Sequence, residues 1–304
     1  MEYENNPASI KFYVKKYINS HQATIKDKIV VDFPAGTGTT SRLIQSVGGN
    51  VKPFDLFPEY FAAANITCQK ADINEGIPLD DKSADMLICQ EGIEHFADQI
   101  KALKEFNRVL KPNGLLLITT PNYSNIRAKM SYLFSESERF NSIMPPNEVD
   151  SIWLSKDTSN DEIYYGHIFL IGIQKLRLLA KLAGFRMTAI YKNRLKTTSL
   201  FLFPFIYPAM ALSNYITYAK AKKRAKGNDH ARRVYRELLA LSINPTILLH
   251  GHLMVEFEKE ADAKEVKATL VDKSDSVLSY FSASAKKAVY LQRNLSILIQ
   301  PIKF

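Results

Sequence analysis

The stretch VVDFPAGTGTTSRL, Val30 to Leu43, decides the fold. An apolar run ends there in an acidic residue, a Gly-x-Gly turn follows at Gly36 and Gly38, and a hydroxyl-rich segment begins the next run. A buried strand that passes through a glycine turn into a helix is typical of the first unit of an open α/β sheet. Because glycine adopts positive φ without a steric penalty and lets a ligand approach the backbone, this loop predicts a ligand site.

Strand-like and helix-like runs alternate on both sides of this stretch. Strands are predicted at 28–33, 51–56, 66–72, 84–90, 115–121, 185–191 and 247–257, and helices at 10–18, 39–47, 97–111 and 172–185. Alternation of this kind favours a mostly parallel sheet with right-handed crossovers and helices on both faces. We therefore expect an α/β fold with a Rossmann-like, seven-stranded sheet.

The chain is predicted to hold one main domain, residues 1–260, and a C-terminal extension, residues 261–304. With 304 residues, 46% of them hydrophobic, it can bury a full core. Within the domain, the polar segment 124–166 contains two adjacent prolines and is predicted to be a lid rather than part of the sheet. Residues 193–246 are predicted to be an insertion between the sixth and seventh strands.

Cysteine usage and the N-terminal sequence both indicate the cytoplasm. The chain has two cysteines, Cys68 and Cys89, without CxxC spacing, which suits a reducing compartment and predicts neither a disulfide framework nor a thiolate metal site. The sequence MEYENN at the start has no basic region followed by an apolar stretch, so no export signal is predicted.

Three classes of protein use a glycine-rich loop after the first strand. A P-loop nucleotide hydrolase is excluded because no Gly-Lys-Ser/Thr follows the turn. A dinucleotide dehydrogenase needs a third glycine where this chain has Thr39 to Ser41. Asp55, at the end of the second strand, can accept ribose hydroxyls, and Asp72, after the third strand, can accept an adenine amino group. Asp55 suits the ribose of either cofactor, so the missing third glycine and the full order of these positions are what favour the third class, which binds S-adenosylmethionine.

Four motifs in order carry a wider resemblance. Over about residues 28–185 the chain resembles the class I S-adenosylmethionine-dependent methyltransferase family. The motifs that carry this resemblance are VVDFPAGTG, FDL, ADINEGIPLDDKSADMLICQEGIEH and EFNRVLKPNGLLLITTPN. The resemblance implies S-adenosylmethionine as cofactor. It also implies which residues contact the methionine end, the ribose and the adenine of the cofactor, and which residue forms the floor beneath it. The residues implied are Asp32, Pro34, Gly36 and Gly38 (methionine end), Asp55 and Leu56 (ribose), Asp72 and Ile73 (adenine), and Gln90 (floor).

Pro34 departs from the family pattern, which usually has its first glycine there. Because proline fixes φ and donates no N–H, the turn must differ at this residue.

Candidate catalytic groups follow the fourth strand in QEGIEH. Glu91, Glu94 and His95 are spaced to face one another, and His167 precedes the next predicted helix. A hydroxyl acceptor needs a base, so His95, His167 and Glu91 are predicted to be catalytic. The same oxygen and imidazole groups, those of Glu91, Glu94, His95 and His167, could hold a divalent ion such as Mg²⁺ or Mn²⁺.

The sequence EGIEH carries a narrower resemblance. It is similar to the Glu-x-x-Glu-His stretch of ubiquinone-biosynthesis O-methyltransferases, and to the metal-binding stretch of small-RNA 2′-O-methyltransferases. The first implies O-methylation of a small, lipid-like or lipid-linked acceptor, and the second implies an RNA acceptor. The tryptophan-containing sequence of the RNA enzymes is absent after His167, which favours the first. A relative without catalysis that binds the cofactor, or a partner, for regulation is a third possibility.

The insertion contains 23 residues without a charge, 197–219, enough to span a bilayer. Pro204 and Pro208 are expected to break a helix there, and basic residues flank both ends, which favours a segment at one membrane surface. We therefore expect peripheral contact through 197–226 with the inner face of the membrane. A lid over the substrate or a dimer face is the alternative.

The net charge of +9 is concentrated after the apolar segment. Eight basic residues and one acidic residue lie between Lys220 and Arg236, a density that would attract anionic lipid. Nucleic-acid binding usually adds aromatic residues between the charges, and only Tyr235 qualifies here. Nucleic acid is therefore the less favoured partner, and the sequence does not indicate an oligomeric state.

Overall fold

The structure, a computed structural model, describes residues 3–138, 144–154 and 163–266. The main unit of the chain ends at residue 264. Most of the predicted C-terminal extension, residues 267–304, lies outside the described residues. All elements named below belong to the main unit.

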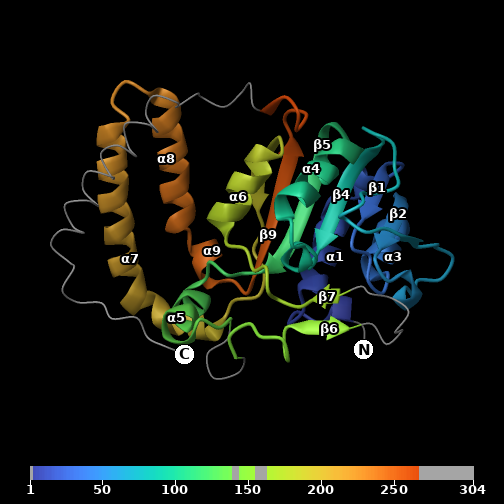
Figure 1. Ribbon diagram of the computed structural model, residues 1–304, viewed down its shortest axis with the longest axis horizontal. Coiled ribbons are helices and arrows are strands. Elements are labelled where there is room, and N and C mark those ends of the chain that lie inside the picture. Colours follow the sequence, from blue (N-terminus) through green and yellow to red (C-terminus); the bar gives the residue numbers. More distant parts are fainter. Residues whose placement is uncertain (1–2, 139–143, 155–162, 267–304) are drawn as a thin grey trace, which may run out of the picture. The chain divides into compact units, whose positions relative to one another are not determined.

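Seven strands form one mixed sheet in the order β3-β2-β1-β4-β5-β9-β8 (Figure 1). Their bounds are β1 Ile29–Asp32, β2 Asn50–Asp55, β3 Gln69–Lys70, β4 Ala84–Gln90, β5 Leu110–Pro121, β8 Phe185–Ile190 and β9 His252–Lys259. Strand β9 runs antiparallel to both of its neighbours, and the other pairings are parallel. The predicted Rossmann-like α/β fold is confirmed.

Helices cover both faces of the sheet. The helices are α1 Ile10–Ser20, α2 Gln22–Ile25 and α3 Thr39–Ser46 on one face, and α4 Gln99–Val109, α6 Ile173–Leu182 and α9 Pro245–Leu249 on the other. Successive side chains of a strand point to opposite faces. Val30 and Met86 accordingly pack with α1 and α3, whereas Val31 and Leu87 pack with α4 and α6. Burial on both faces explains why β1 and β4 are apolar without alternation.

The last strand begins later than predicted. Residues 245–249 form α9, and β9 starts only at His252. The side chain of Asn244 accepts a hydrogen bond from the backbone N–H of Thr246, and Pro245 occupies the first helical position. Both features favour a helix start, so the apolar run ILL continues as a helix turn rather than a strand.

The predicted lid contains regular structure. Helix α5 spans Ile126–Ser135, and β6 Ile152–Leu154 pairs antiparallel with β7 Ile163–Tyr165. The expectation of no sheet in 124–166 is therefore wrong for this small hairpin. Residues 139–143 and 155–162 of the lid lie outside the described residues.

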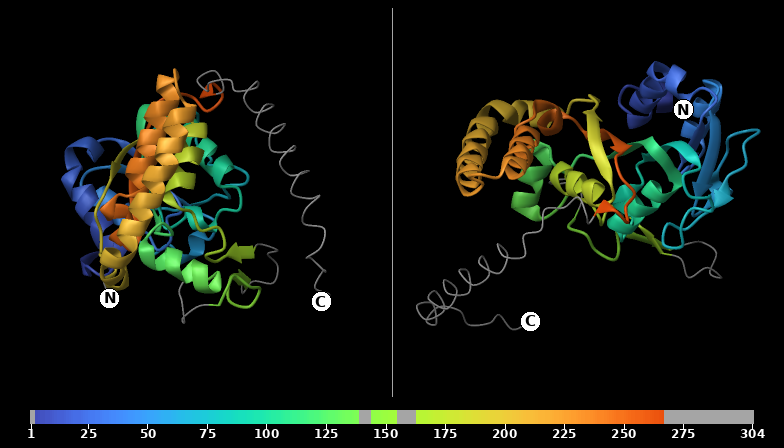
Figure 2. Two further views of the ribbon diagram at one scale, coloured as in Figure 1. Left: turned by 90° about the vertical axis from the view of Figure 1, so that its left-hand side faces the viewer. Right: turned by 90° about the horizontal axis from the view of Figure 1, so that it is seen from above.

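The insertion folds into a helical hairpin. Helix α7 spans Thr197–Arg224 and α8 spans Asp229–Ser242, and the two lie side by side (Figures 1 and 2). The expectation that Pro204 and Pro208 would break the helix is wrong, because α7 continues through both. The prolines are four residues apart and lie on the exposed face, while the opposite face packs on α5, α8 and α9. Tertiary packing of that face outweighs the two hydrogen bonds that the prolines cannot make.

Candidate active site

A cavity of about 920 Å³ opens beyond the carboxyl ends of the central strands. The neighbours of β1 are β2 on one side and β4 on the other, so the chain changes direction across the sheet between β1 and β4. Open α/β sheets bind ligands at such a switch point. The loop after β1, the end of β2 and the end of β4 all line the cavity, as the sequence predicted.

Seven of the nine predicted cofactor residues line this cavity. They are Pro34, Gly36, Asp55, Leu56, Asp72, Ile73 and Gln90. Asp32 and Gly38 are not in its wall. The structure thus brings most of the predicted set together, although their binding roles stay predictions.

Asp55 fastens the glycine loop to the neighbouring strand. Its Oδ2 accepts a hydrogen bond from the backbone N–H of Gly36 at 2.7 Å, and its Oδ1 accepts one from the N–H of Phe57 at 2.9 Å. A carboxylate has about four acceptor positions, so two remain for ribose hydroxyls. Gly36 has a φ of +51°, which glycine adopts most easily.

Asp32 supports this loop from beneath. It is fully buried, and its Oδ2 accepts a hydrogen bond from the hydroxyl of Ser41 at 2.5 Å. Burial, together with the negative charge of Asp55, raises the pKa of Asp32 to about 7. Burial places Asp32 under the loop rather than in the cavity wall, and its predicted role at the methionine end is untested.

Gly38 has a packing role in the structure, and its predicted binding role is untested. Its φ is +81°, and a Cβ there would lie 2.7 Å from the Cβ of Ala63 and 2.8 Å from the ring of Phe61. Glycine is needed so that the segment after β2 can pack on the loop.

Gln90 and Asp72, two other predicted residues, are each oriented at the cavity by one hydrogen bond. Gln90 accepts a hydrogen bond from the hydroxyl of Thr40 at 2.7 Å, and Asp72 accepts one from the backbone N–H of Asn74 at 2.8 Å. Each bond fixes one side-chain oxygen, and the Gln90 amide and the second Asp72 oxygen make no further hydrogen bond in the described part of the chain.

The sequence reasoning missed part of the cavity wall. The additional lining residues come from the N-terminus, the segment after β2, the turn after β4 and β7; they include Tyr3, Ser9, Lys11, Phe57, Tyr60, Phe96, Tyr164 and Tyr165. Ser9 is the N-cap of α1, which was a readable signal for the helix start. No local signal indicates that α1 and β7 close over the ends of the sheet.

The ring of Pro34 packs directly against Gly92. A Cβ at Gly92 would lie 2.7 Å from the Cγ of Pro34 and 3.1 Å from the sulfur of Cys89, which is too close. The φ of Gly92 is −123°, so any residue could adopt its backbone conformation. The requirement for glycine at 92 is therefore steric and comes from the ring of Pro34.

His95 is held in one tautomer by β7. It ends the short 3₁₀ helix η3, Ile93–His95, and its Nδ1 lies 2.6 Å from the carbonyl oxygen of Tyr165. A carbonyl can only accept, so Nδ1 carries the hydrogen, and Nε2 accepts from the hydroxyl of Tyr164 at 3.1 Å. Burial, with a further contribution from His167, lowers the pKa of His95 below its usual 6.5, so the ring is neutral at pH 7.

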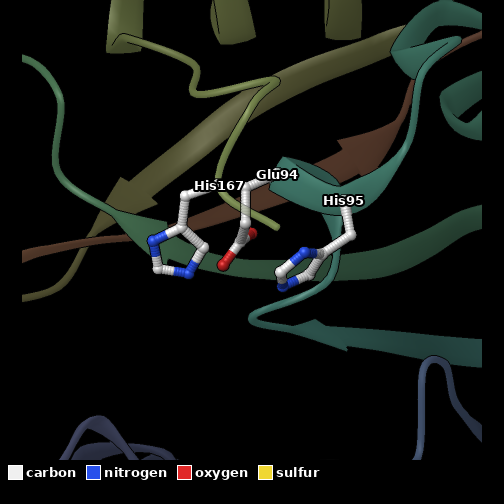
Figure 3. A group of neighbouring side chains, drawn as sticks. All are labelled: Glu94, His95 and His167. Atoms are coloured by element: carbon white, nitrogen blue, oxygen red, sulfur yellow. The ribbon is translucent and has the colours of Figure 1, made fainter. Parts of the chain in front are cut away.

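Glu94, His95 and His167 meet at one point (Figure 3). One ligand atom from each lies within 4.8 Å of the others. Glu94 is fully buried, and neither of its oxygens has a hydrogen-bond partner in the described part of the chain. Burial and the charge of Glu91 raise its pKa well above the usual value. A buried carboxylate beside two imidazoles has the donor chemistry of a Mn²⁺ site more than of a Mg²⁺ site.

Glu91 is the predicted ligand that does not join this group. One of its oxygens accepts a hydrogen bond from Thr119 at 3.1 Å, and the other lies 3.3 Å from Nε2 of His252. Its φ of +49° turns the chain between β4 and η3, which removes the helical spacing that the prediction assumed. Glu91 lines the cavity nevertheless, and its predicted catalytic role is untested.

Comparison with known proteins finds a methyltransferase domain in this chain. Residues 31–118 match the methyltransferase domain family. The ubiquinone biosynthesis O-methyltransferase of Rickettsia typhi is 30% identical over 42% of this chain and 53% of that protein. The demethylmenaquinone methyltransferase of Chlorobaculum tepidum is 29% identical over 36% of this chain and 52% of that protein. The chain spans about half the length of the curated relatives it matches.

A solved structure of a methyltransferase also aligns with the chain. The S-adenosylmethionine-dependent methyltransferase from Archaeoglobus fulgidus is 13% identical and covers 81% of this chain and 93% of that chain, with a TM-score of 0.48. The domain match identifies residues 31–118 as a methyltransferase domain, and the strands within these residues belong to the seven-stranded sheet described above.

Proposed function

We propose that the protein transfers a methyl group from S-adenosylmethionine to an oxygen atom of a small, lipid-like or lipid-linked acceptor. One observation carries the proposal: the cavity that holds Asp55, Asp72 and Gln90 also holds a neutral, oriented imidazole, that of His95. The domain match supports the donor. The names of two relatives, which act in quinone biosynthesis, support the class of acceptor.

The chain's first task is to hold donor and acceptor in line. Asp55 would bind the ribose hydroxyls, and Asp72 the adenine amino group, while Phe57 and Tyr60 supply apolar wall. When bound, S-adenosylmethionine supplies an electrophilic methyl group on sulfur. Alignment in a cavity that excludes water accounts for most of the rate that such an enzyme needs.

His95 would accept the proton of the acceptor hydroxyl. Its Nε2 has a lone pair because Nδ1 carries the hydrogen. The hydroxyl of Tyr164 donates a hydrogen bond to this lone pair, and the acceptor hydroxyl would replace it there. The methyl group moves to the acceptor oxygen, the O–H proton moves to Nε2, and S-adenosylhomocysteine leaves.

Two of the predicted alternatives receive less support. An RNA acceptor has no support from the relatives named here, which are quinone enzymes. A divalent ion at Glu94, His95 and His167 stays a prediction. An ion on Nε2 of His95 would displace the Tyr164 hydroxyl and remove the base, so the two roles of this nitrogen exclude each other.

The first prediction tests the donor site. We expect Asp55→Ala to weaken binding of S-adenosylhomocysteine by a factor on the order of 30, because hydrogen bonds to a charged group contribute about 1.5–3 kcal/mol. Calorimetric titration of wild type and variant measures this, and NADH is the control ligand. Tight NADH binding, or no binding of S-adenosylhomocysteine by folded wild type, would contradict the assignment.

A second cavity of about 120 Å³ adjoins the first and suits the acceptor. The two share Glu91, and the second is also lined by Arg127, Lys196, His167 and His252. The guanidinium of Arg127 makes no ion pair or hydrogen bond in the part of the chain that the structure describes. A half-buried cation without a partner favours an acceptor that carries a negative charge near the methylated hydroxyl.

The second prediction tests this placement. We expect Arg127→Met to lower methylation of a membrane lipid extract about 10-fold at limiting extract, with unchanged affinity for S-adenosylhomocysteine. Arg127→Lys, which keeps the charge, should recover part of the loss. Methyl incorporation from labelled S-adenosylmethionine is the measurement. Equal rates for wild type and Arg127→Met would show that the acceptor does not use this cation.

A further inference from the structure

Helix α7 carries a continuous apolar stripe that no other described element covers. The stripe, called the α7 stripe below, recurs every three or four residues and so lies along one face; it consists of Phe201, Phe205, Pro208, Leu212, Tyr215, Ile216 and Ala219. Among its large apolar side chains, the most exposed are Phe201 at 72%, Phe205 at 69% and Leu212 at 63%. A helix that is apolar on all sides is normally buried, yet Ser199 is the one buried residue of α7.

Basic residues stand at both ends of the stripe. Three basic residues precede α7, namely Lys192, Arg194 and Lys196. Five more lie in its last turns or just beyond its end: Lys220, Lys222, Lys223, Arg224 and Lys226. No acidic residue occurs between 192 and 228. At 1.5 Å per residue, the stripe from 201 to 219 is about 27 Å long, so its two basic ends are well separated. An elongated apolar surface with cations at each end is complementary to an anionic lipid surface.

We propose that α7 binds in the plane of an anionic bilayer surface, with the stripe in the boundary between headgroups and acyl chains. The basic ends then contact lipid phosphates. Tyr215 suits this depth because its ring is apolar and its hydroxyl is polar, and the phenylalanines of the stripe supply apolar surface.

The neighbouring helix argues against a transmembrane orientation. Helix α8 lies alongside α7 and carries Arg232, Arg233 and Arg236 (Figure 2). If α7 crossed the bilayer, these charges would enter hydrocarbon at a high cost. Glu237 of α8 also makes two hydrogen bonds, of 2.7 and 2.5 Å, with Arg177 of α6, which tie the hairpin to the domain. Binding in the plane keeps all of these contacts.

The N-terminal end of the stripe lies at the second cavity. Lys196 lines that cavity, and the hydroxyl of Ser199 accepts a hydrogen bond from the backbone N–H of Arg127 at 3.2 Å. Leu133 of α5, a helix that packs on α7, is also 71% exposed. A lipid acceptor held at the surface would thus reach the site directly, a consequence that rests on the proposed function, whereas membrane binding itself does not.

The proposal is tested with the full-length protein and vesicles. We expect wild type to sediment with vesicles of phosphatidylcholine and phosphatidylglycerol at 3:1, and much less with phosphatidylcholine alone, with binding reduced by salt. The variant Phe201→Ser/Phe205→Ser/Leu212→Ser should bind at least 10-fold more weakly. Leu178→Ser is the matched control, because Leu178 is an exposed leucine of α6, outside the stripe, and should not affect binding.

A depth measurement separates the two orientations. Phe201→Trp and Tyr215→Trp, each in a Trp153→Phe background, should be quenched equally and at shallow depth by brominated lipids. A spanning helix would place these residues about 21 Å apart in depth. Unequal depths, or equal vesicle binding by wild type and the triple variant, would overturn the proposal.

Further controls separate this proposal from its alternatives. If the triple substitution converts a dimer into a monomer by light scattering and leaves vesicle binding unchanged, the stripe is an interface between copies and the proposal is wrong. Titration with S-adenosylhomocysteine should give the same affinity for every variant. If the wild type does not bind S-adenosylhomocysteine, the proposed function is wrong. If a variant loses only vesicle binding, its affinity for S-adenosylhomocysteine stays unchanged.

Discussion

His95→Gln should slow methyl transfer by a factor of about 10² to 10⁴ while affinity for S-adenosylhomocysteine changes little. Glutamine can still donate to the carbonyl of Tyr165, so the local fold is retained, but an amide cannot accept a proton at neutral pH. Initial rates of methyl incorporation into a lipid extract measure the effect. If affinity for S-adenosylhomocysteine fell by the same factor as the rate, His95 would instead position the donor.

The rate of the wild type should depend on pH in a defined direction. Burial and His167 lower the pKa of His95 below its usual 6.5, so the acidic limb of the rate profile should have its midpoint below pH 6.5. Tyr164→Phe should move this acidic limb to higher pH, because it removes a hydrogen bond that favours the neutral ring. The same sign holds for stability, since protonation of the unfolded histidine lowers the free energy of unfolding as pH falls below 6.5.

EDTA provides the discriminating control for His95. If the imidazole is the base, EDTA leaves the rate unchanged. Loss of activity in EDTA with recovery in Mn²⁺ would confirm the predicted metal site at Glu94, His95 and His167, and the assignment of His95 as base would be wrong.

Much of the fold could be predicted because local pattern and tertiary environment agree. Strands β1 and β4 are buried on both faces, so their apolar runs are unambiguous, and acidic residues such as Asp55 mark the strand ends where ligands bind. The chain order of these elements then sets the sheet and most of the cavity wall.

The errors arose where packing overrides local preference. Pro204 and Pro208 predict a helix break, but a long face packed on three helices keeps α7 continuous. Helical spacing grouped Glu91 with Glu94 and His95, whereas the left-handed backbone at Glu91 turns it toward His252. The contribution of α1 and β7 to the cavity depends on contacts between distant segments, which no short motif records.

Gly92→Ala should weaken binding of S-adenosylhomocysteine on the order of 100-fold. The backbone at 92 tolerates alanine, so the cost comes from the new Cβ, which would meet the ring of Pro34 in the cofactor loop. Overpacking of this kind costs about 1–3 kcal/mol, and a displaced loop adds lost contacts to the ligand. Calorimetric titration and thermal unfolding of the variant measure both parts.

Pro34→Gly should rescue this variant, because glycine removes the ring that the new Cβ would meet and restores the residue that the family usually has. We expect Pro34→Gly alone to bind S-adenosylhomocysteine within a few-fold of wild type, and the double variant to recover most of the affinity. The coupling energy between the two positions should then be about 1–3 kcal/mol. A double variant as weak as Gly92→Ala would contradict the steric account, and the departure at Pro34 would be independent of Gly92. Because His95 follows Gly92 by three residues, rescue should restore the rate together with the affinity.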